Sequence, residues 1–536
     1  MAYNVPAIIH RIESNLIALD ACSLMGLPNI RADLALEAFT KDSDNSDEHD
    51  AEKVNFQGGM GNNYERLEFL GDCFLKMATT IAIFTLVQEQ SEFHLHCERM
   101  ALLCNQNLFN NALDVKLEEY VRSMAFNRRT WYPEGLTLKK GKRPEVRRRH
   151  ALGDKSIADV CEALIGAAYL TTYETHDFDM AIQAVTAVVK DKKHTMTKYS
   201  QYYEAYEKPK WQTESPSADQ LNMARKFHER MGYKFTYPRL LRSAFHHPSY
   251  PFNYENLPSY QRLEFLGDSL FDMVCIDYIF HRYPGADPQW LTEHKMAMVS
   301  NQFLGCLAFY LGFHKSVLAN SPAVVSDIVG YVTEMEEALL AAKEDAVRAG
   351  KTEADFNRSF WLNCGRPPKA LPDVLEAYIG AIFVDSEYDF SVVQAFFDKH
   401  VKPWFQDMHV YDTFANTHPV KMVGTLMQSR FHCSDWRILV RSAAISGGNS
   451  SDGAVGLLGD STRTQDVVCG VLVHGKMLAH TVSESGRYGK VAVAKKALAI
   501  LEGMDFDGFR GTYGCDCVVE EEDDASHLEE AIGSAI

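Results

Sequence analysis

The chain has 536 residues, of which 46% are hydrophobic, and its formal net charge is −18. This length is too great for one hydrophobic core and predicts three or four domains, while the hydrophobic fraction excludes an intrinsically disordered chain. The longest apolar runs are shorter than a membrane-spanning helix requires, and the N-terminus lacks the pattern of a signal peptide. We therefore expect an intracellular protein of the cytoplasm or nucleus, not bound to membranes, whose twelve cysteines are mostly reduced.

An eight-residue string occurs twice, as ERLEFLGD at Glu65–Asp72 and as QRLEFLGD at Gln261–Asp268. Each copy is followed about a hundred residues later by two acidic residues with the spacing DxxE. These residues are Asp159 with Glu162, and Asp373 with Glu376. The strings are 196 residues apart and the DxxE pairs are 214 apart, so the chain contains a duplicated unit.

Apolar residues recur around each string at the spacing of one helix face, which predicts that the strings and the DxxE pairs lie on helices. Acidic residues three or four positions apart are then neighbours on one face. Carboxylate oxygens are the protein ligands that Mg²⁺ prefers, so each repeat is predicted to hold a metal centre. A single pair of this kind usually only decorates a helix, but linked pairs that recur favour the metal centre. The predicted ligands are Glu68, Asp72, Asp159 and Glu162 in repeat 1, and Glu264, Asp268, Asp373 and Glu376 in repeat 2.

Two further pairs of residues occur at matching positions in the repeats. Lys155 and Lys369 each precede the DxxE pair by four residues and are candidates for contacting a transferred phosphate. Gly71 and Gly267 lie in the middle of the first predicted helices, where glycine costs about 1 kcal/mol relative to alanine. Close approach of another backbone, such as that of the other repeat, would compensate for this cost.

A strongly basic segment interrupts the acidic chain. Residues 128–150 contain nine Lys or Arg residues and two Glu residues. Because the segment directly precedes the first DxxE pair, it could contact phosphates, although a solvated loop fits equally well. Lys139–Arg149 could instead act as a nuclear localisation signal.

The repeats differ by an insertion, and a different kind of sequence follows them. The second repeat is longer by 18 residues between its two acidic pairs, and residues 321–360 there predict a charged helix. Lys190–Lys210 is typical of a linker. After Pro403 the pattern predicts a small α-β-β(-β)-α unit of about 90 to 100 residues. Its predicted elements are a helix at His418–Arg430, strands at Arg437–Ser442 and Asp466–His474, a Gly/Ser-rich loop at Gly447–Gly459 and a helix at Lys490–Leu501.

The repeated string, the DxxE pairs and the segment Arg242–Tyr250 (RSAFHHPSY) resemble the signature of the ribonuclease III family. Two such domains followed by a small α-β unit resemble the C-terminal half of a fungal Dicer-like protein. The resemblance implies a mainly α fold, with two all-helical ribonuclease III domains that form an intramolecular pseudo-dimer and a small α-β-β-β-α domain like those that bind double-stranded RNA. The predicted boundaries are 1–200 for the first domain, 201–234 for a linker helix, 235–405 for the second domain, 415–517 for the small domain and 518–536 for an acidic tail.

The same resemblance implies a Mg²⁺- or Mn²⁺-dependent endoribonuclease that cleaves double-stranded RNA in RNA silencing. Each centre would cut one strand and leave a short 3′ overhang. The sequence contains nothing like the helicase and PAZ domains of a full Dicer. We therefore expect either a missing N-terminal half or a separate helicase or PAZ protein as a partner, and a monomer in solution. The alternative is a non-catalytic RNA-binding or scaffold protein.

The resemblance to fungal Dicer-like proteins also implies a structural zinc site in the small domain. Its ligands would be Cys433, His474, Cys515 and Cys517. Three thiolates and one imidazole complete a tetrahedral site, although four unrelated residues remain the alternative, and His432 or His480 could replace His474. The last helix carries few lysines for RNA (Lys490, Lys495 and Lys496), so a protein-docking role for this domain is equally well supported.

Overall fold

The computed structural model describes residues 4–41, 62–88, 90–123, 152–412, 414, 419–442, 467–483 and 486–517. The chain divides into two compact units, Met1–Val410 and Tyr411–Ile536, each of which is described by itself. The basic segment 128–150, the loop Gly447–Gly459 and the tail 518–536 lie outside the described residues, as does most of the linker to the second unit.

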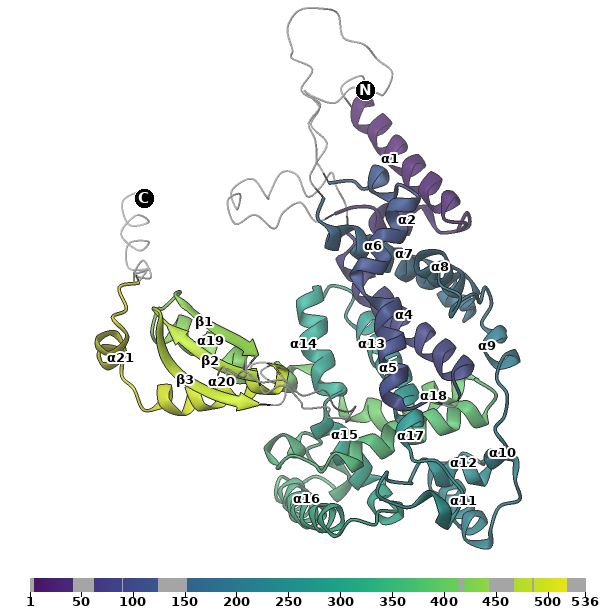
Figure 1. Cartoon of the computed structure of the whole chain (residues 1–536), viewed down its shortest axis with the longest axis vertical. Coiled ribbons are helices and arrows are strands. Elements are labelled where there is room, and N and C mark those ends of the chain that lie inside the picture. The colour runs from purple at the N-terminus through teal and green to yellow at the C-terminus, as the bar shows by residue number, and fades with distance from the viewer. Residues whose placement is uncertain are drawn as a thin grey trace, which may run out of the picture. The chain divides into compact units, whose positions relative to one another are not determined.

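The first unit is helical in its described residues and is built around two pairs of packed helices (Figure 1). In repeat 1, α4 (Glu65–Leu86) packs along α7 (Asp154–Thr171). In repeat 2, α13 (Gln261–Arg282) packs along α17 (Ala370–Asp385) in the same way. The first helix of each pair carries the repeated string and the second carries the DxxE pair, which confirms the helical prediction.

Glycine allows the two helices of each pair to approach closely. A Cβ atom on Gly71 would lie 1.8 Å from the backbone oxygen of Glu162, and one on Gly267 would lie 1.8 Å from that of Glu376. No side chain fits at such a distance, so only glycine allows this packing. The prediction of a close backbone approach is confirmed. The suggestion that the neighbour is the other repeat is wrong, because the DxxE helix of the same repeat occupies that place.

Other helices surround these two pairs. Repeat 1 adds α1 (Val5–Leu24), α2 (Ala32–Ala38), α5 (Glu92–Leu103), α6 (Asn105–Asp114) and α8 (Asp179–Val189). The segment between α8 and α12 connects the two repeats, and we call it the connection. It contains α9 (Ser200–Glu204), α10 (Lys210–Thr213) and α11 (Ala218–Met231). Repeat 2 adds α12 (Pro238–Ser243), α14 (Pro288–Met298), α15 (Asn301–Tyr310), α16 (Pro322–Arg348) and α18 (Phe390–Phe396). Phe227 of α11 contacts the rings of Phe245 and Phe313, so this helix packs on repeat 2.

The inserted charged helix is present as α16, which is 27 residues long. The helix ends at Arg348, and Gly350 follows it with a φ of +75°, a backbone conformation that favours glycine. The insertion therefore adds one peripheral helix without changing the central pair of repeat 2.

The two repeats meet through α4 and α13, which contact each other directly. Their contacts are reciprocal: Arg66 donates to the carbonyl of Phe280 (3.3 Å), and Arg262 donates to the carbonyl of Phe84 (3.1 Å). Each guanidinium also lies over the ring of the same phenylalanine, 4.6 and 5.2 Å from its centroid. Arg66 and Arg262, like Phe84 and Phe280, are 196 residues apart, so the repeats are related by an approximate twofold axis.

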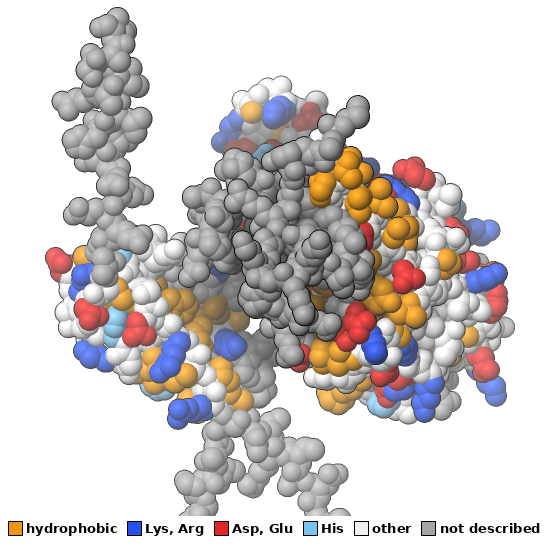
Figure 2. Space-filling model, turned by 90° about the horizontal axis from the view of Figure 1, so that it is seen from above, with side chains coloured by type: hydrophobic (Ala, Val, Ile, Leu, Met, Phe, Trp, Pro, Cys, Tyr) orange, Lys and Arg blue, Asp and Glu red, His pale blue; other side chains and the backbone are white. Residues whose placement is uncertain are grey.

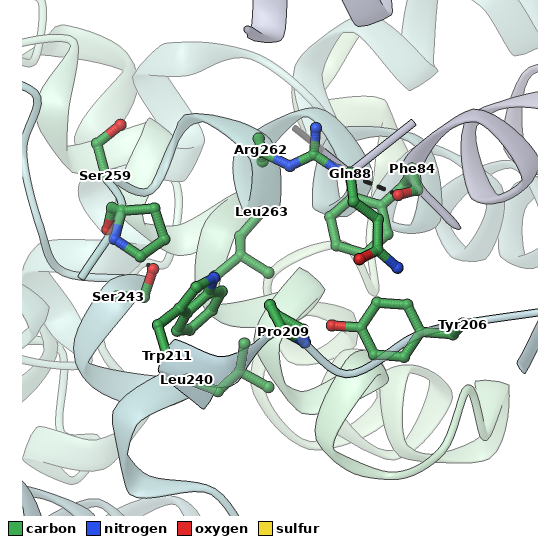
Figure 3. A pocket seen from close by; sticks show the side chains of 11 residues that line it. Phe84, Gln88, Tyr206, Pro209, Trp211, Leu240, Ser243, Ser259, Arg262 and Leu263 are labelled. Atoms are coloured by element: carbon green, nitrogen blue, oxygen red, sulfur yellow. Dashed lines mark hydrogen bonds between the residues drawn. The ribbon is translucent and has the colours of Figure 1, made fainter. Parts of the chain in front are cut away.

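A cavity of about 100 Å³ lies at one end of this interface. Its walls come from the end of α4, the connection, α12, and the start of α13 with the residues just before it. Figure 3 shows Arg262 reaching past this space toward Phe84. The connection contributes Tyr206, Pro209 and Trp211, so it packs between the repeats.

Among the described residues, α4 is the one helix that is long and apolar enough to cross a membrane. The sequence did not predict this, because each of its uninterrupted apolar runs is shorter than a membrane-spanning helix. Its most apolar window has a mean hydropathy of 1.5, but 78% of this window is buried inside the protein, as in a core helix.

Helix α1 exposes apolar side chains, including Ile8, Ile12 and Leu16. Figure 2 shows hydrophobic side chains on the face of the protein viewed from that end.

The second unit contains an antiparallel sheet in the order β1-β2-β3 with helices packed on it. Its elements are α19 (Pro419–Ser429), β1 (Trp436–Ser442), β2 (Val467–Val473), β3 (Lys476–Ser483), α20 (Gly486–Glu502) and α21 (Phe506–Tyr513). The α-β-β-β-α order is confirmed, and α21 is an addition that the sequence did not predict. The ring of Phe509 in α21 stacks on Phe431 at 4.2 Å, which holds the following residues against the domain.

Candidate metal centres

Three carboxylates of repeat 1 converge between α4 and α7. The closest oxygens of Glu68, Asp159 and Glu162 all lie within 4.8 Å of one another. Glu264, Asp373 and Glu376 form the matching group between α13 and α17, within the same limit. One divalent cation can bind oxygens at this separation, so each repeat brings together three of its four predicted ligands.

The fourth predicted ligand of each centre lies beside the group but outside it. Asp72 and Asp268 are one helical turn beyond Glu68 and Glu264. Among the neighbouring carboxylates, each does most to raise the pKa of the DxxE glutamate of its own repeat. Asp268 is instead bound by Lys76 of the other repeat, whose Nζ lies 2.9 Å from its Oδ2. In each repeat, therefore, three of the four predicted carboxylates form the group, and the fourth, Asp72 or Asp268, lies next to it.

Each centre has one lysine that bridges two of its carboxylates. Lys155 Nζ lies 2.7 Å from Asp159 Oδ1 and 3.4 Å from Glu68 Oε1. Lys369 Nζ lies 2.7 Å from Asp373 Oδ2 and 3.1 Å from Glu264 Oε1. Both lysine side chains are about 70% exposed, so each cation is at the solvent-facing side of its centre, accessible to an anionic group.

A tyrosine that the sequence reading did not identify supports the first DxxE carboxylate in each repeat. The hydroxyl of Tyr260 donates to Asp373 Oδ2 at 3.0 Å, and that of Tyr64 lies 3.5 Å from Asp159 Oδ2. Each tyrosine directly precedes the repeated string, at the same offset of 196 residues. Extending the comparison of the two strings by one residue would have found this pair.

The four predicted zinc ligands also converge, within the second unit. The ligand atoms of Cys433, His474, Cys515 and Cys517 lie within 4.8 Å of one another, and His474 Nε2 is 3.5 Å from the sulfurs of both Cys433 and Cys517. His474 and Gly475 have φ angles of +47° and +74°, as in a two-residue hairpin turn, and this turn between β2 and β3 carries the imidazole to the group. His432 and His480 are not members of the group.

A carboxylate orients the imidazole of this group. His474 Nδ1 lies 3.4 Å from Asp435 Oδ2, the arrangement in which a carboxylate fixes the tautomer of a zinc-bound histidine. Hydrogen bonds from Ser434 lower the pKa of Cys517 to about 6, whereas burial raises that of Cys433 to about 12. The donor set and its outer partner therefore fit a closed structural zinc site.

Comparison with known proteins connects these groups to a family. Residues 65–173 and 261–387 match the ribonuclease III domain, and residues 411–503 match a dsRNA binding domain. The chain belongs to the ribonuclease III family. It is 62% identical to Dicer-like protein 1 of Chaetomium globosum and 63% identical to that of Neurospora crassa, over 98% and 96% of its own length. It spans about a third of the length of each of these relatives.

Solved structures of the family are more distant. Dicer from Pichia stipitis is 17% identical, covers 48% of this chain and 92% of its own, and gives a TM-score of 0.21. Dicer from Giardia intestinalis is 14% identical, covers 64% of this chain and 55% of its own, and gives a TM-score of 0.34.

Burial and the nearby carboxylates of the same centre disfavour the ionised form of several acidic side chains in the candidate metal centres. Burial, together with the neighbouring carboxylates, raises the pKa of Glu162 to about 9 and that of Glu264 to about 8. The same causes raise the pKa of Glu376 well above its usual range. Glu264 Oε2 is buried and has no hydrogen-bond partner among the described residues. A buried acidic group with too few donors is what a divalent cation would stabilise, so both centres fit a metal ion.

These pKa values predict how the stability of the protein depends on pH and Mg²⁺. Between about pH 5 and 9 the folded, metal-free protein keeps a proton on Glu162 that the unfolded chain releases, so its free energy of unfolding should fall as the pH rises. Mg²⁺ binds the ionised carboxylates, so it should raise the melting temperature by several degrees at pH 8.5 and much less at pH 6. Thermal melting with and without Mg²⁺ checks this, and an equal rise at both pH values would contradict it.

Proposed function

We propose that the chain is a divalent-metal-dependent endoribonuclease that cuts double-stranded RNA, with one cutting centre in each ribonuclease III domain. The observation that carries this proposal is the pair of three-carboxylate groups with matched geometry, each of which has a lysine at its opening. A domain that has lost catalysis would be expected to have lost some of these carboxylates, and all eight are retained in this sequence.

The residues of each centre would have different roles in the reaction. Glu68, Asp159 and Glu162 would hold the cation in the first domain, and Glu264, Asp373 and Glu376 in the second. A bound Mg²⁺ or Mn²⁺ supplies an activated water and neutralises charge that develops on the phosphate. Tyr64 and Tyr260 keep the first DxxE carboxylate in place, while Lys155 and Lys369 offer a positive charge to the phosphate oxygens.

Cleavage by two related centres accounts for a duplex substrate. An approximate twofold axis between α4 and α13 relates the two centres. The two antiparallel strands of an RNA duplex are also related by twofold axes, so each centre can meet one strand in the same way. Each centre would then cut one strand and leave a short 3′ overhang. The relatives are named Dicer-like, and we propose on this basis that the products serve RNA silencing.

The second unit would bind the same substrate. Lys490 and Lys495 are exposed on α20, while Lys496 Nζ donates to the carbonyl of His480 at 3.3 Å. The exposed lysines described on this helix suit contacts to the phosphates of an A-form duplex, and their small number predicts weak binding that depends strongly on salt.

Incubation of a long labelled RNA duplex with the purified chain tests the proposal. Fragments should form in Mg²⁺ and none in EDTA, and a single-stranded RNA of the same sequence should stay intact. Absence of Mg²⁺-dependent cutting, in a preparation that binds the duplex, would leave a non-catalytic RNA-binding protein as the better description.

We also propose that Zn²⁺ binds Cys433, His474, Cys515 and Cys517. It would hold the residues that follow α21 against the rest of the second unit. Elemental analysis should find about one zinc per chain. Cys517→Ser should lower the melting temperature of this unit by several degrees, since a structural zinc site contributes directly to folding. The exposed Cys97 is a matched control, and Cys97→Ser should change neither the zinc content nor the melting. Purified protein without zinc would refute the site.

A further inference from the structure

The contact between the two ribonuclease III domains is reciprocal at most positions but not at its centre. Arg66 and Arg262 make the same contacts with the opposite repeat, as do the phenylalanines beneath them. Under such an axis, a residue near the centre faces its own equivalent in the other repeat. Lys76 and Asp272 are 196 residues apart and are therefore equivalent positions, and they do face each other.

The two equivalent residues have opposite charges and form a short ion pair. Lys76 Nζ lies 2.7 Å from Asp272 Oδ2, and the side chains are only 23% and 7% exposed. Lys295 approaches the other oxygen of Asp272 at 3.1 Å, and Lys76 also reaches Asp268. Partly buried charges depend on their partners far more than exposed ones, so removing one partner leaves the other strongly destabilised.

Pairing of like repeats would bring like charges together at this point. Two copies of repeat 1 would place Lys76 against Lys76, and two copies of repeat 2 would place Asp272 against Asp272. The unlike pair instead places opposite charges against each other, whereas in two copies of repeat 2 each Asp272 would keep Lys295 of its own repeat but would face a second carboxylate. The cost of a desolvated like-charge contact is what allows an interface to reject a wrong partner that is otherwise similar in shape.

We propose that Lys76 and Asp272 determine which ribonuclease III domains pair, selecting the unlike domain and rejecting a second copy of the same one. The contact of Lys76 with Asp268 ties this choice to the second metal centre, because the lysine that selects the partner also binds a carboxylate beside that centre. This inference concerns domain pairing and holds whether or not the centres cleave RNA.

Charge exchange in the full chain tests the proposal. Lys76→Asp and Asp272→Lys should each lower the melting temperature of the first unit, by roughly 5 °C or more. The double variant should recover most of this loss. Under the twofold relation, the lysine introduced at position 272 would face Asp72 as Lys76 now faces Asp268, so it would have an acidic neighbour besides Lys295.

A matched control uses the exposed Lys402–Asp398 pair, which has a distance of 3.1 Å and side chains about half exposed. The same exchange there should change the melting temperature by less than about 2 °C, singly or together. This control separates the effect of the domain contact from the general effect of charge reversal.

Mixing the two single variants gives a second readout. Each alone has only like charges to pair, whether within one chain or between chains, and should stay single-chain and unstable. Together they offer opposite charges across chains, so native mass spectrometry should detect a two-chain species that melts above either variant. If the double variant melts as low as the single ones, or if the mixture contains no two-chain species, this ion pair does not select the partner.

Discussion

A chain that carries Glu376→Gln should nick duplex RNA on one strand only, and Glu162→Gln should nick the opposite strand. Each glutamate belongs to one of the two carboxylate groups, and glutamine keeps its size while removing the charge that holds a cation. Loss of a group that stabilises charge at the reacting centre typically costs about 10²- to 10³-fold in rate, so cutting of one strand should fall by about that factor. The double variant should cut neither strand.

Labelling the two strands of one duplex with different dyes measures this result. A denaturing gel then shows which strand is cut, and a native gel shows whether the duplex stays whole. Glu337→Gln makes the same substitution at an exposed position of α16 and should leave both strands cut at the normal rate. If either single substitution at a centre slows both strands equally, the two centres do not act on separate strands.

The duplication made most of the first unit predictable from its sequence. Two copies of one pattern show which spacings matter, so the helices and the convergence of Glu68 with Asp159 and Glu162 follow from the sequence. The displacement of Asp72 and Asp268 from the groups does not follow. For Asp268 it depends on the contact between α4 and α13, which brings Lys76 of the first repeat to this carboxylate of the second.

The second unit shows a different limit. The positions of the three cysteines in the sequence could not show which of three histidines completes the site. His474 is selected by the hairpin turn between β2 and β3, and the number of residues between ligands does not predict the geometry of that turn. Helix α21 was missed because it has eight residues and includes Gly508 and Gly511, which weaken any helical pattern. It forms where Phe509 packs on Phe431, a tertiary contact that overrides weak propensity.

Gly71→Ala and Gly267→Ala should be among the most destabilising single methyl additions in the protein, each costing about 4 kcal/mol or more of unfolding free energy. The new Cβ would lie 1.8 Å from the backbone oxygen of Glu162 or Glu376, so the two central helices must move apart. This movement would displace the DxxE glutamate itself, and cutting by the affected centre should be lost even at temperatures where the variant stays folded.

Gly330→Ala provides the opposite result with the same chemical change. Gly330 also lies inside a helix, on the exposed side of α16, and a Cβ there would meet nothing within 4 Å. Because alanine is the better helix former, this variant should gain about 0.5 to 1 kcal/mol. Urea denaturation of the three variants measures both effects. Helix propensity alone predicts a gain at every site, so a loss at residues 71 and 267 beside a gain at residue 330 isolates the contact between helices. A gain at all three would mean that α4 and α7 are not packed closely enough to hold one cation between them.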